Sequence, residues 1–305
     1  MQVKTRLNNA KSVINDSPGR KLFLAINYIF LALIVVVSMV PIINILALSF
    51  SDKIHVAAGD VKLWPVGFTL ESYAFVMKNP QFLNSFLVSV ERSLLGVAIN
   101  MACTILVAYP LSKADKQFRA RKYYLWYFII TMLFSGGLIP WYMVVKYTGI
   151  YNSIWALVIP GAVPVYNVIL LMNFFRELPK EIEESAFIDG AGHFMVLMRM
   201  YLPLSLAALA TLVLFSFVFH WNSWFDGMIF MRSKDGIPLQ TYLQSVLTIP
   251  DLARMDAKEI ESYFRINIRS VKAAEIFIAT LPIFSLYPFL QKYFTKGIVL
   301  GSVKG

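Results

Sequence analysis

The sequence predicts an all-α integral membrane protein with six transmembrane helices. Of its 305 residues, 58% are hydrophobic and only 15% are charged, and the mean hydropathy is +0.62. A soluble domain has about 25% charged residues. Several apolar runs reach roughly 20 residues, which is the length that crosses a bilayer as a helix, whereas barrel strands alternate and need only about 10. Helices are therefore the predicted spanning elements.

Six apolar segments are the predicted spans, and together they form one transmembrane domain over residues 22–294. The first follows a basic N-terminal tail, residues 1–21, and is too long for the apolar region of a signal peptide, which has about 7–15 residues. We therefore expect it to be an uncleaved span. The six predicted spans are Leu22–Leu48, Phe82–Tyr109, Tyr123–Val145, Ile154–Phe175, Leu204–Met231 and Ala274–Phe294.

Basic residues predict the orientation of these spans. The N-terminal tail, the loop 112–122 and the C-terminal tail, residues 295–305, are rich in Lys and Arg and poor in acids. Lys and Arg concentrate on the cytoplasmic side of membrane proteins. With six spans these three segments fall on one side, so both termini are predicted to be cytoplasmic. Segments 51–81 and 232–273 then face outward.

The outer segment 232–273 is polar, and we expect a short surface helix around Asp256–Arg265. Its length suits contact with another protein outside the membrane. A solvated loop is the open alternative.

The loop 176–203 joins spans four and five and departs from this pattern because it is acidic. Pro179 suits the first turn of a helix, whose positive N-terminal end favours acids. The pair Asp189-Gly190 indicates a turn, because glycine accepts a positive φ. A second helical face follows with Phe194, Leu197, Met198 and Tyr201.

We predict a helix–turn–helix on the inner membrane surface, with Glu183 and Glu184 directed into the cytoplasm. A purely interfacial amphipathic element is the alternative. Such helices favour Lys and Arg on the polar face, so the carboxylates fit a basic protein partner better.

The sequence offers no catalytic or metal chemistry. The three histidines are far apart without ligand spacing, and Cys103 is the only cysteine. Gly190 and Gly192 have G-x-G spacing, but no strand precedes them and no Lys-Ser/Thr pair follows, so we reject a nucleotide-binding loop. We expect neither ATP hydrolysis nor a cofactor in this chain. The net charge of +10 comes from basic residues beside apolar runs, as the positive-inside rule expects. It therefore does not indicate nucleic-acid binding.

Glu91 and Arg92 within the second predicted span are candidates for a substrate pathway. A charge at bilayer depth costs about 2.5–3.5 kcal/mol and normally faces a partner or a water-filled path. Neighbours in sequence do not face each other on a helix, so at least one should pair with another helix. The alternative places both near the outer interface.

The end of the fifth predicted span is the second candidate. Trp221 and Trp224 supply aromatic faces, while Asn222 and Asp226 supply groups that hydrogen-bond to hydroxyls, a combination that suits sugar rings. An aromatic belt at the outer membrane interface is the alternative.

Three ordered stretches resemble the EAA motif of permease subunits in binding-protein-dependent ABC importers. They are Glu184-Ser185-Ala186, Asp189-Gly190-Ala191 and Leu202-Pro203. Other stretches resemble the carbohydrate-importing MalG-like branch, especially its LplC-like group: Trp64-Pro65, Gly67-Phe68-Thr69-Leu70, His220-Trp221-Asn222-Ser223-Trp224-Phe225-Asp226 and Lys296-Gly297-Ile298. The resemblance covers nearly the whole chain from the first span onward. Ser185 replaces the first alanine of the motif, and Ala207 replaces a common second proline, so we expect a straighter entry into span five.

The resemblance implies the fold of a type I ABC importer permease, in which the acidic loop is the EAA coupling helix. Residues 180–203 would dock on a cytoplasmic ATPase dimer, which would bind ATP and Mg. The residues implied in this coupling are Glu183, Glu184, Ser185, Ala186, Asp189, Gly190, Ala191, Leu202 and Pro203. The chain itself would be non-catalytic.

The resemblance also implies the partners and the location. A second homologous permease subunit would supply the other half of the pathway in a bacterial inner membrane. An extracytoplasmic solute-binding protein would deliver a carbohydrate, above all an oligosaccharide. The alternatives are an ion-coupled secondary transporter acting alone and a non-transporting assembly factor. The first would need ionisable groups along the spans and internal repeats, and only Glu91 and Arg92 qualify.

Overall fold

The computed structural model describes residues 18–247 and 268–301. Within these ranges the regular secondary structure is helical, apart from one isolated bridge between Ser51 and Phe68. The described residues group into two compact units, one from residues 18–73 and 268–274, the other from 74–247 and 275–301. The helix expected around Asp256–Arg265 lies outside the described residues.

The first unit contains the first predicted span as one uninterrupted helix, α2 (Pro18–Ser49). None of the most apolar window of α2 is buried within the protein, so lipid or another protein must cover it. The short helix α3 (Lys53–Ala58) follows. The Asp52 carboxylate caps α3 by accepting from the backbone N–H groups of Ile54 and His55. Helix α4 (Glu71–Lys78) then leads into the second unit.

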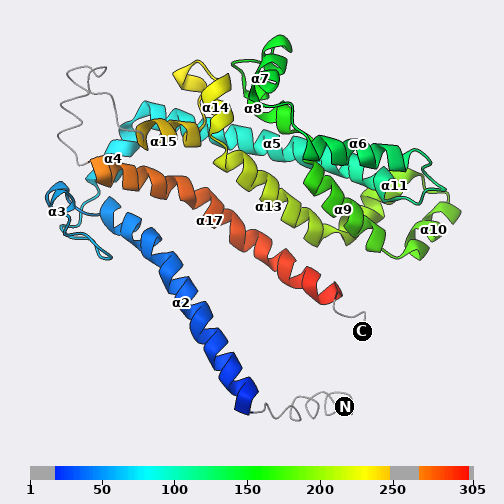
Figure 1. Ribbon diagram of the computed structural model, residues 1–305, viewed down its shortest axis with the longest axis horizontal. Helices are drawn as coiled ribbons and strands as arrows, with labels where there is room; N and C mark the ends of the chain where they lie inside the picture. Colours follow the sequence, from blue (N-terminus) through cyan, green and yellow to red (C-terminus); the bar gives the residue numbers. More distant parts are fainter. Residues whose placement is uncertain (1–17, 248–267, 302–305) are drawn as a thin grey trace. The chain divides into compact units, whose positions relative to one another are not determined.

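The second unit is built around α5 (Pro80–Ser112), with α9 and α13 packed along it (Figure 1). Its other elements are α6 (Arg121–Leu133), α7 (Leu138–Tyr147), α8 (Ile154–Val158), η1 (Ile159–Gly161), α9 (Val165–Glu177), α10 (Lys180–Ile188), α11 (His193–Val196), the π-helix η2 (Leu197–Tyr201), α12 (Leu202–Leu204), α13 (Leu206–Asn222), α14 (Phe225–Phe230), η3 (Lys234–Gly236), α15 (Leu239–Leu247) and α17 (Ile268–Gly301) from Glu275 onward.

A buried stripe of small and polar residues explains why α5 is central. The stripe consists of Ser85, Ser89, Ser93, Gly96, Asn100 and Thr104. These residues recur every three or four positions and therefore share one helix face. Small side chains let neighbouring helices approach closely in a membrane, where they favour association. At Gly96 an added Cβ would lie 2.4 Å from the His220 ring on α13, so the crossing of these two helices requires glycine.

Among the described residues, three helices are long and apolar enough to cross a membrane: α2, α5 and α17 up to Pro288. Three bent helix pairs raise the number to as many as six if each pair is one span. Predicted span three is one of these pairs and not a straight helix. Helices α6 and α7 meet at 114° across residues 134–137, where the poor helix formers Gly136 and Gly137 interrupt the apolar run.

Predicted spans four and five are also broken. Residues 154–161 and α9 meet at 46°, across a segment that contains Pro164. Span five was expected to reach Met231, but α13 ends at Asn222 and α14 is a separate helix. The entry into span five is bent by 84° at Ser205, just after Pro203 removes a backbone donor.

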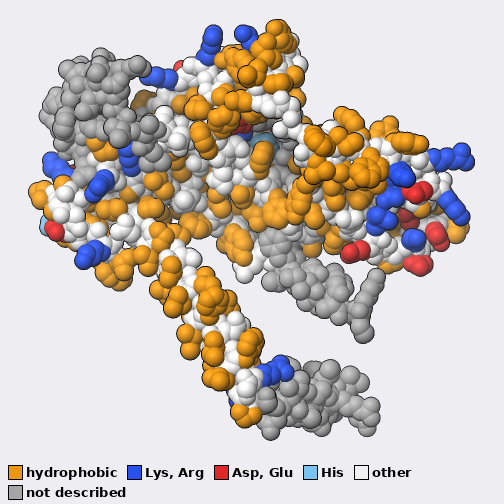
Figure 2. Space-filling view, viewed as in Figure 1, with side chains coloured by type: hydrophobic (Ala, Val, Ile, Leu, Met, Phe, Trp, Pro, Cys, Tyr) orange, Lys and Arg blue, Asp and Glu red, His pale blue; other side chains and the backbone are white. Residues whose placement is uncertain are grey.

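Charged side chains concentrate at one end of the second unit. Figure 2 shows Lys, Arg, Asp and Glu gathered over the region of α10 and α11, while hydrophobic side chains dominate the neighbouring surface of α6. The exposed aromatic residues of α6 include Tyr123, Tyr124, Trp126 and Tyr127. A surface of this composition fits lipid or a partner protein better than water.

Candidate functional site

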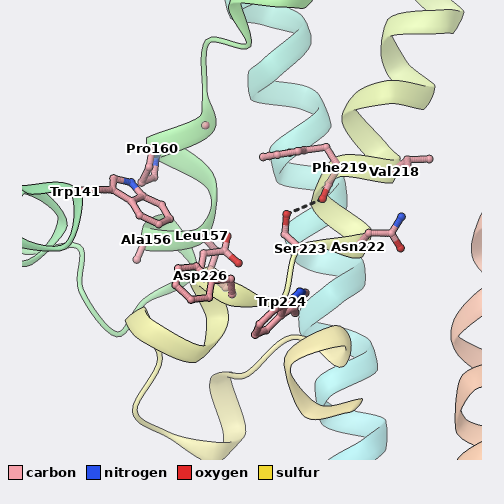
Figure 3. Close-up of a pocket in the computed structure, with 12 residues that line it drawn as sticks. Trp141, Ala156, Leu157, Pro160, Val218, Phe219, Asn222, Ser223, Trp224 and Asp226 are labelled. Carbon is pink, nitrogen blue, oxygen red and sulfur yellow. Dashed lines mark hydrogen bonds between the residues drawn. The ribbon is translucent and has the colours of Figure 1, made fainter. Parts of the chain in front are cut away.

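A pocket of about 680 Å³ lies beside the break between α13 and α14. Its lining is mainly apolar and aromatic, from Trp141, Ala156, Leu157, Pro160, Gly161, Val218, Phe219, Asn222, Ser223, Trp224, Phe225 and Asp226. The pocket therefore contains three of the four residues predicted at the end of span five: Asn222, Trp224 and Asp226. Figure 3 shows Trp141, Leu157 and Asp226 on one side, with Phe219, Ser223 and Asn222 on the other. An apolar cavity with a few fixed polar groups is typical of a small-molecule site.

Arg92 on α5 holds one wall of this pocket. Its side chain is fully buried, and its guanidinium forms a bidentate ion pair with Asp226, with Nη1 3.1 Å from Oδ1 and Nη2 bonded to Oδ2. The guanidinium also donates to the Ser223 carbonyl at 3.1 Å and to the Leu157 carbonyl at 3.4 Å. One cation on α5 thus fixes α8, the break after α13 and the start of α14. Of the two alternatives for Arg92, the structure has the paired one.

Glu91 and Trp221 lie elsewhere. Glu91 is exposed on α5 and is not part of the pocket lining. Trp221 is only 1% exposed, and its indole N–H donates to the Ala279 carbonyl at 3.0 Å. The prediction that Trp221 lines the pathway is therefore wrong for this structure. A backbone acceptor on α17 and ring contacts with Phe86 and Phe217 make the indole a core side chain.

A second polar group on α5 was not predicted. The Asn100 amide, oriented to suit its neighbours, donates to the carbonyls of Gly161 and Gly96 at 3.1 and 3.2 Å and accepts from His220 Nε2 at 3.2 Å. These contacts tie α5 to the bend in predicted span four and to α13. The signal in the sequence is the spacing of Asn100 from Gly96 and Ser93, which places it on the buried stripe.

The acidic loop forms a sharp elbow, which we call the acidic elbow: α10, the turn at Gly190, and α11. Gly190 has a φ of +82°, which confirms the predicted positive φ. Its N–H donates to the Phe187 carbonyl at 3.1 Å, and the Ala191 N–H donates to the Ala186 carbonyl at 2.9 Å. This pair of bonds is a Schellman motif, in which glycine ends a helix in the left-handed conformation. The turn is therefore a fixed corner.

Glu183 does not face outward as predicted. Its carboxylate is buried and lies 2.8 Å from Lys113 Nζ, at the end of α5, and Tyr201 Oη donates to it at 2.5 Å. Burial lowers the pKa of the Lys113 amine, and the hydrogen bond to Glu183 opposes this shift. Glu183 faces inward because α10 also buries Ala186, one turn away on the same face.

The outer face of the elbow combines carboxylates with apolar side chains. Glu184 and Asp189 are exposed, as are Ile188 at 85% and Phe194 at 68%. The predicted second helical face is only partly correct, because Leu197 and Tyr201 are buried whereas Phe194 and Met198 are exposed. The π-helix η2 changes the number of residues per turn at this point and so alters which side chains turn inward.

The other residues of the EAA-like pattern are spread along the elbow and its exit. The Ser185 hydroxyl donates to the Ile182 carbonyl at 3.1 Å within α10, and Ala191 is partly buried beneath the turn. Leu202 and Pro203 begin α12, before the bend at Ser205. Within residues 18–247 and 268–301, no group of three or more His, Cys, Asp and Glu side chains is placed to hold a metal ion.

Comparison with known proteins gives the family. No protein-family model matches the chain. The chain is 39% identical over 291 residues to Protein LplC of Bacillus subtilis, covering 95% of this chain and 97% of that protein. It is 36% identical over 285 residues to the polygalacturonan/rhamnogalacturonan transport system permease protein YtcP of the same organism, covering 93% and 99%. The chain belongs to the sugar ABC transporter permeases.

A solved structure supports this assignment. A chain of a bacterial ABC transporter involved in the import of the acidic polysaccharide alginate superimposes on this permease with a TM-score of 0.84. The two chains are 29% identical, and the match covers 92% of this permease and 99% of that chain. The resemblance to the LplC-like group, stated from sequence motifs, is confirmed, and the helical fold is that of an ABC importer permease.

Loss of the ion pair between Arg92 and Asp226 should destabilise the permease. Arg92→Ala leaves a carboxylate without its partner, and breaking a buried pair costs about 3–5 kcal/mol. We expect a lower melting temperature for the purified permease complex and partial recovery in Arg92→Ala/Asp226→Asn. Glu91→Ala, an exposed change on the same helix, is the control and should melt like the wild type. An unchanged melting temperature and uptake in Arg92→Ala would contradict the role assigned to the pair.

Proposed function

We propose that this permease is one of two homologous membrane subunits of an ATP-driven importer of oligosaccharides. Residues 22–294 would form six spans, with each of the three bent helix pairs crossing the membrane once. This chain would form half of the translocation pathway and would carry no covalent chemistry. ATP and Mg would bind a separate cytoplasmic ATPase dimer, and an extracytoplasmic solute-binding protein would deliver the sugar.

The acidic elbow is the observation that supports coupling to an ATPase. It presents the exposed carboxylates of Glu184 and Asp189 beside the exposed apolar side chains of Ile188 and Phe194. A protein interface combines apolar anchors with charges that set orientation, so this face suits a partner with a basic, partly apolar cleft. The Schellman corner at Gly190 keeps the two legs of the elbow together. The elbow would therefore move as one body, as the coupling helix of an importer must.

The pocket beside Arg92 supports passage of a carbohydrate. Trp141, Phe219 and Trp224 supply flat apolar faces, and Asn222 and Asp226 supply hydrogen-bonding groups. Flat rings with a few polar groups match the faces and hydroxyls of a sugar. The relative YtcP is by name a polygalacturonan/rhamnogalacturonan permease, and the structural neighbour belongs to an alginate importer. An oligosaccharide is therefore the proposed substrate class.

The alternatives make different predictions about purification. A secondary transporter would take up substrate alone, and an assembly factor would not support uptake in any complex. An importer permease should co-purify with an ATPase and show sugar uptake only with ATP and the binding protein. Uptake of sugar by this chain alone would contradict the importer proposal.

Labelling of single cysteines tests the six-span topology. We propose that the loop 112–122 and both termini are cytoplasmic because they are basic. In a Cys103→Ala background, the exposed position Asp60→Cys should react with an impermeant reagent in intact cells. Arg119→Cys, also exposed, should react only after permeabilisation. The reverse pattern would contradict the proposed orientation.

Charge reversal on the elbow tests the coupling proposal. Glu184→Lys should abolish binding-protein-stimulated ATP hydrolysis and uptake. A basic cleft would attract the Glu184 carboxylate but repel a lysine at the same position. Glu177→Lys, a charge reversal at another exposed position, at the end of α9, is the control and should retain activity. Normal stimulated hydrolysis in Glu184→Lys would count against the proposed docking.

Two glycine substitutions test the fixed corner of the elbow. Gly190→Ala places a side chain at a positive φ, which costs about 1–2 kcal/mol, whereas Gly192 has a negative φ and open space around it. We expect weaker coupling in Gly190→Ala and normal coupling in Gly192→Ala, measured as sugar transported per ATP hydrolysed. Equal values for the two variants would show that the corner is not required.

Substitutions in the pocket test the sugar path. Trp224→Ala should slow uptake per assembled complex without changing the affinity of the binding protein for sugar, since the stacking face is lost only on the pathway. Asn222→Ala should act in the same direction. Trp126→Ala, at an exposed position on α6, is the control for a general membrane-anchor effect. Wild-type rates per complex in both pocket variants would mean that the pocket carries no sugar.

A further inference from the structure

Lys113, Glu183 and Tyr201 form a closed triangle between the acidic elbow and the end of α5. Lys113 Nζ donates to Glu183 Oε1 at 2.8 Å and to Tyr201 Oη at 3.0 Å, and Tyr201 Oη donates to Glu183 Oε2 at 2.5 Å. The three residues come from the C-terminal cap of α5, from α10 and from η2. We call this triangle the latch.

The latch lies in an aromatic enclosure. Lys113 Nζ lies 3.9 Å from the ring centroid of Tyr109 and 4.2 Å from that of Tyr201. Phe175 on α9 packs edge-on against the Tyr201 ring at 5.3 Å. The side chains of Lys113 and Glu183 are only 6% and 9% exposed, so water screens their attraction weakly. Charge-assisted hydrogen bonds between buried groups are strong and depend on geometry. The latch therefore resists both sliding of the elbow along α5 and its separation from α5.

The neighbouring glutamates therefore differ in what they can contact. Glu184 is exposed and free to meet another subunit, whereas Glu183 could do so only by leaving the latch. Leaving would strand the Lys113 ammonium among aromatic rings without a carboxylate, which is strongly unfavourable. Glu183 is thus an internal connection of the elbow.

Helix α5 extends from the latch to the pocket. It is continuous from Pro80 to Ser112, with Lys113 at its C-terminal cap and Arg92 on its buried face. A helix rises 1.5 Å per residue, so about 30 Å of it separates Arg92 from Lys113. At one end α5 is bonded to the elbow, and towards the other it is bonded to Asp226 and Ser223 at the pocket wall.

We propose that the latch is a positioning element of transport, which fastens the acidic elbow to α5 so that α5 carries displacement of the elbow to the pocket. This inference rests on the proposed coupling function. It assigns to Lys113, Glu183 and Tyr201 a role in transmission, distinct from contact with the ATPase.

The test uses the complete reconstituted complex and compares Glu183→Gln, Lys113→Met and the double variant with the wild type. Glu183→Gln keeps the shape of the side chain and removes its charge. We expect the ATPase to co-purify at the wild-type ratio, while sugar transported per ATP falls about tenfold, as expected for loss of one charge-assisted hydrogen bond. Sugar transported per ATP should fall no further in the double variant than in either single variant, because all three variants break the same connection.

Tyr201→Phe keeps the packing and removes only the hydroxyl. It should also lower sugar transported per ATP. If either charge variant fails to assemble, Tyr201→Phe alone tests the latch. Wild-type sugar per ATP in assembled Tyr201→Phe and Glu183→Gln complexes would overturn the latch. If Glu184→Lys still abolished coupling in that case, the proposed function would stand without the latch. If no ATPase co-purified with the wild type, the proposed function itself would fail.

Discussion

The buried guanidinium of Arg92 sets the arrangement of the second unit. A cation at this depth has no water to solvate it, so its donors must be matched by protein acceptors. The carboxylate of Asp226 and the carbonyls of Ser223 and Leu157 supply that match. These acceptors lie at helix ends: Ser223 follows the last residue of α13, Asp226 is in the first turn of α14, and Leu157 is near the end of α8. The break between α13 and α14 and the buried charge are thus one structural solution, and the pocket forms beside them.

The existence of the apolar segments was predictable because hydrophobic length is read directly from composition. Helices α2 and α5 match their predicted spans closely, and the motif at Gly190 gave the turn with its positive φ. The course of the broken segments was not predictable. Hydropathy depends on composition, so the apolar run from Tyr123 to Val145 has the same value whether the helix continues or turns by 114°. The glycines within the run are compatible with either course.

The side chains whose positions were predicted wrongly have one feature in common. Trp221 and Glu183 each have a strong surface preference, as an interfacial aromatic and a carboxylate, and each is buried by a partner distant in sequence. The Ala279 carbonyl is 58 positions from Trp221, and Lys113 is 70 positions from Glu183. Helical periodicity describes one element at a time and contains no information about such partners. Arg92 could be predicted to need a partner, and Asp226 was among the candidates, but only the tertiary structure joins the two.

The bare tip of the acidic elbow has a consequence for the life of the protein in the cell. Ile188 and Phe194 are exposed apolar side chains of the elbow, on which Glu184 and Asp189 are also exposed. In the complex proposed above the ATPase would cover these side chains, whereas in a permease without its ATPase they would face water. Exposed apolar surface of this kind marks an interaction site or becomes an aggregation liability. With the docking proposed above, we expect the abundance of this chain to fall when the ATPase subunit is missing.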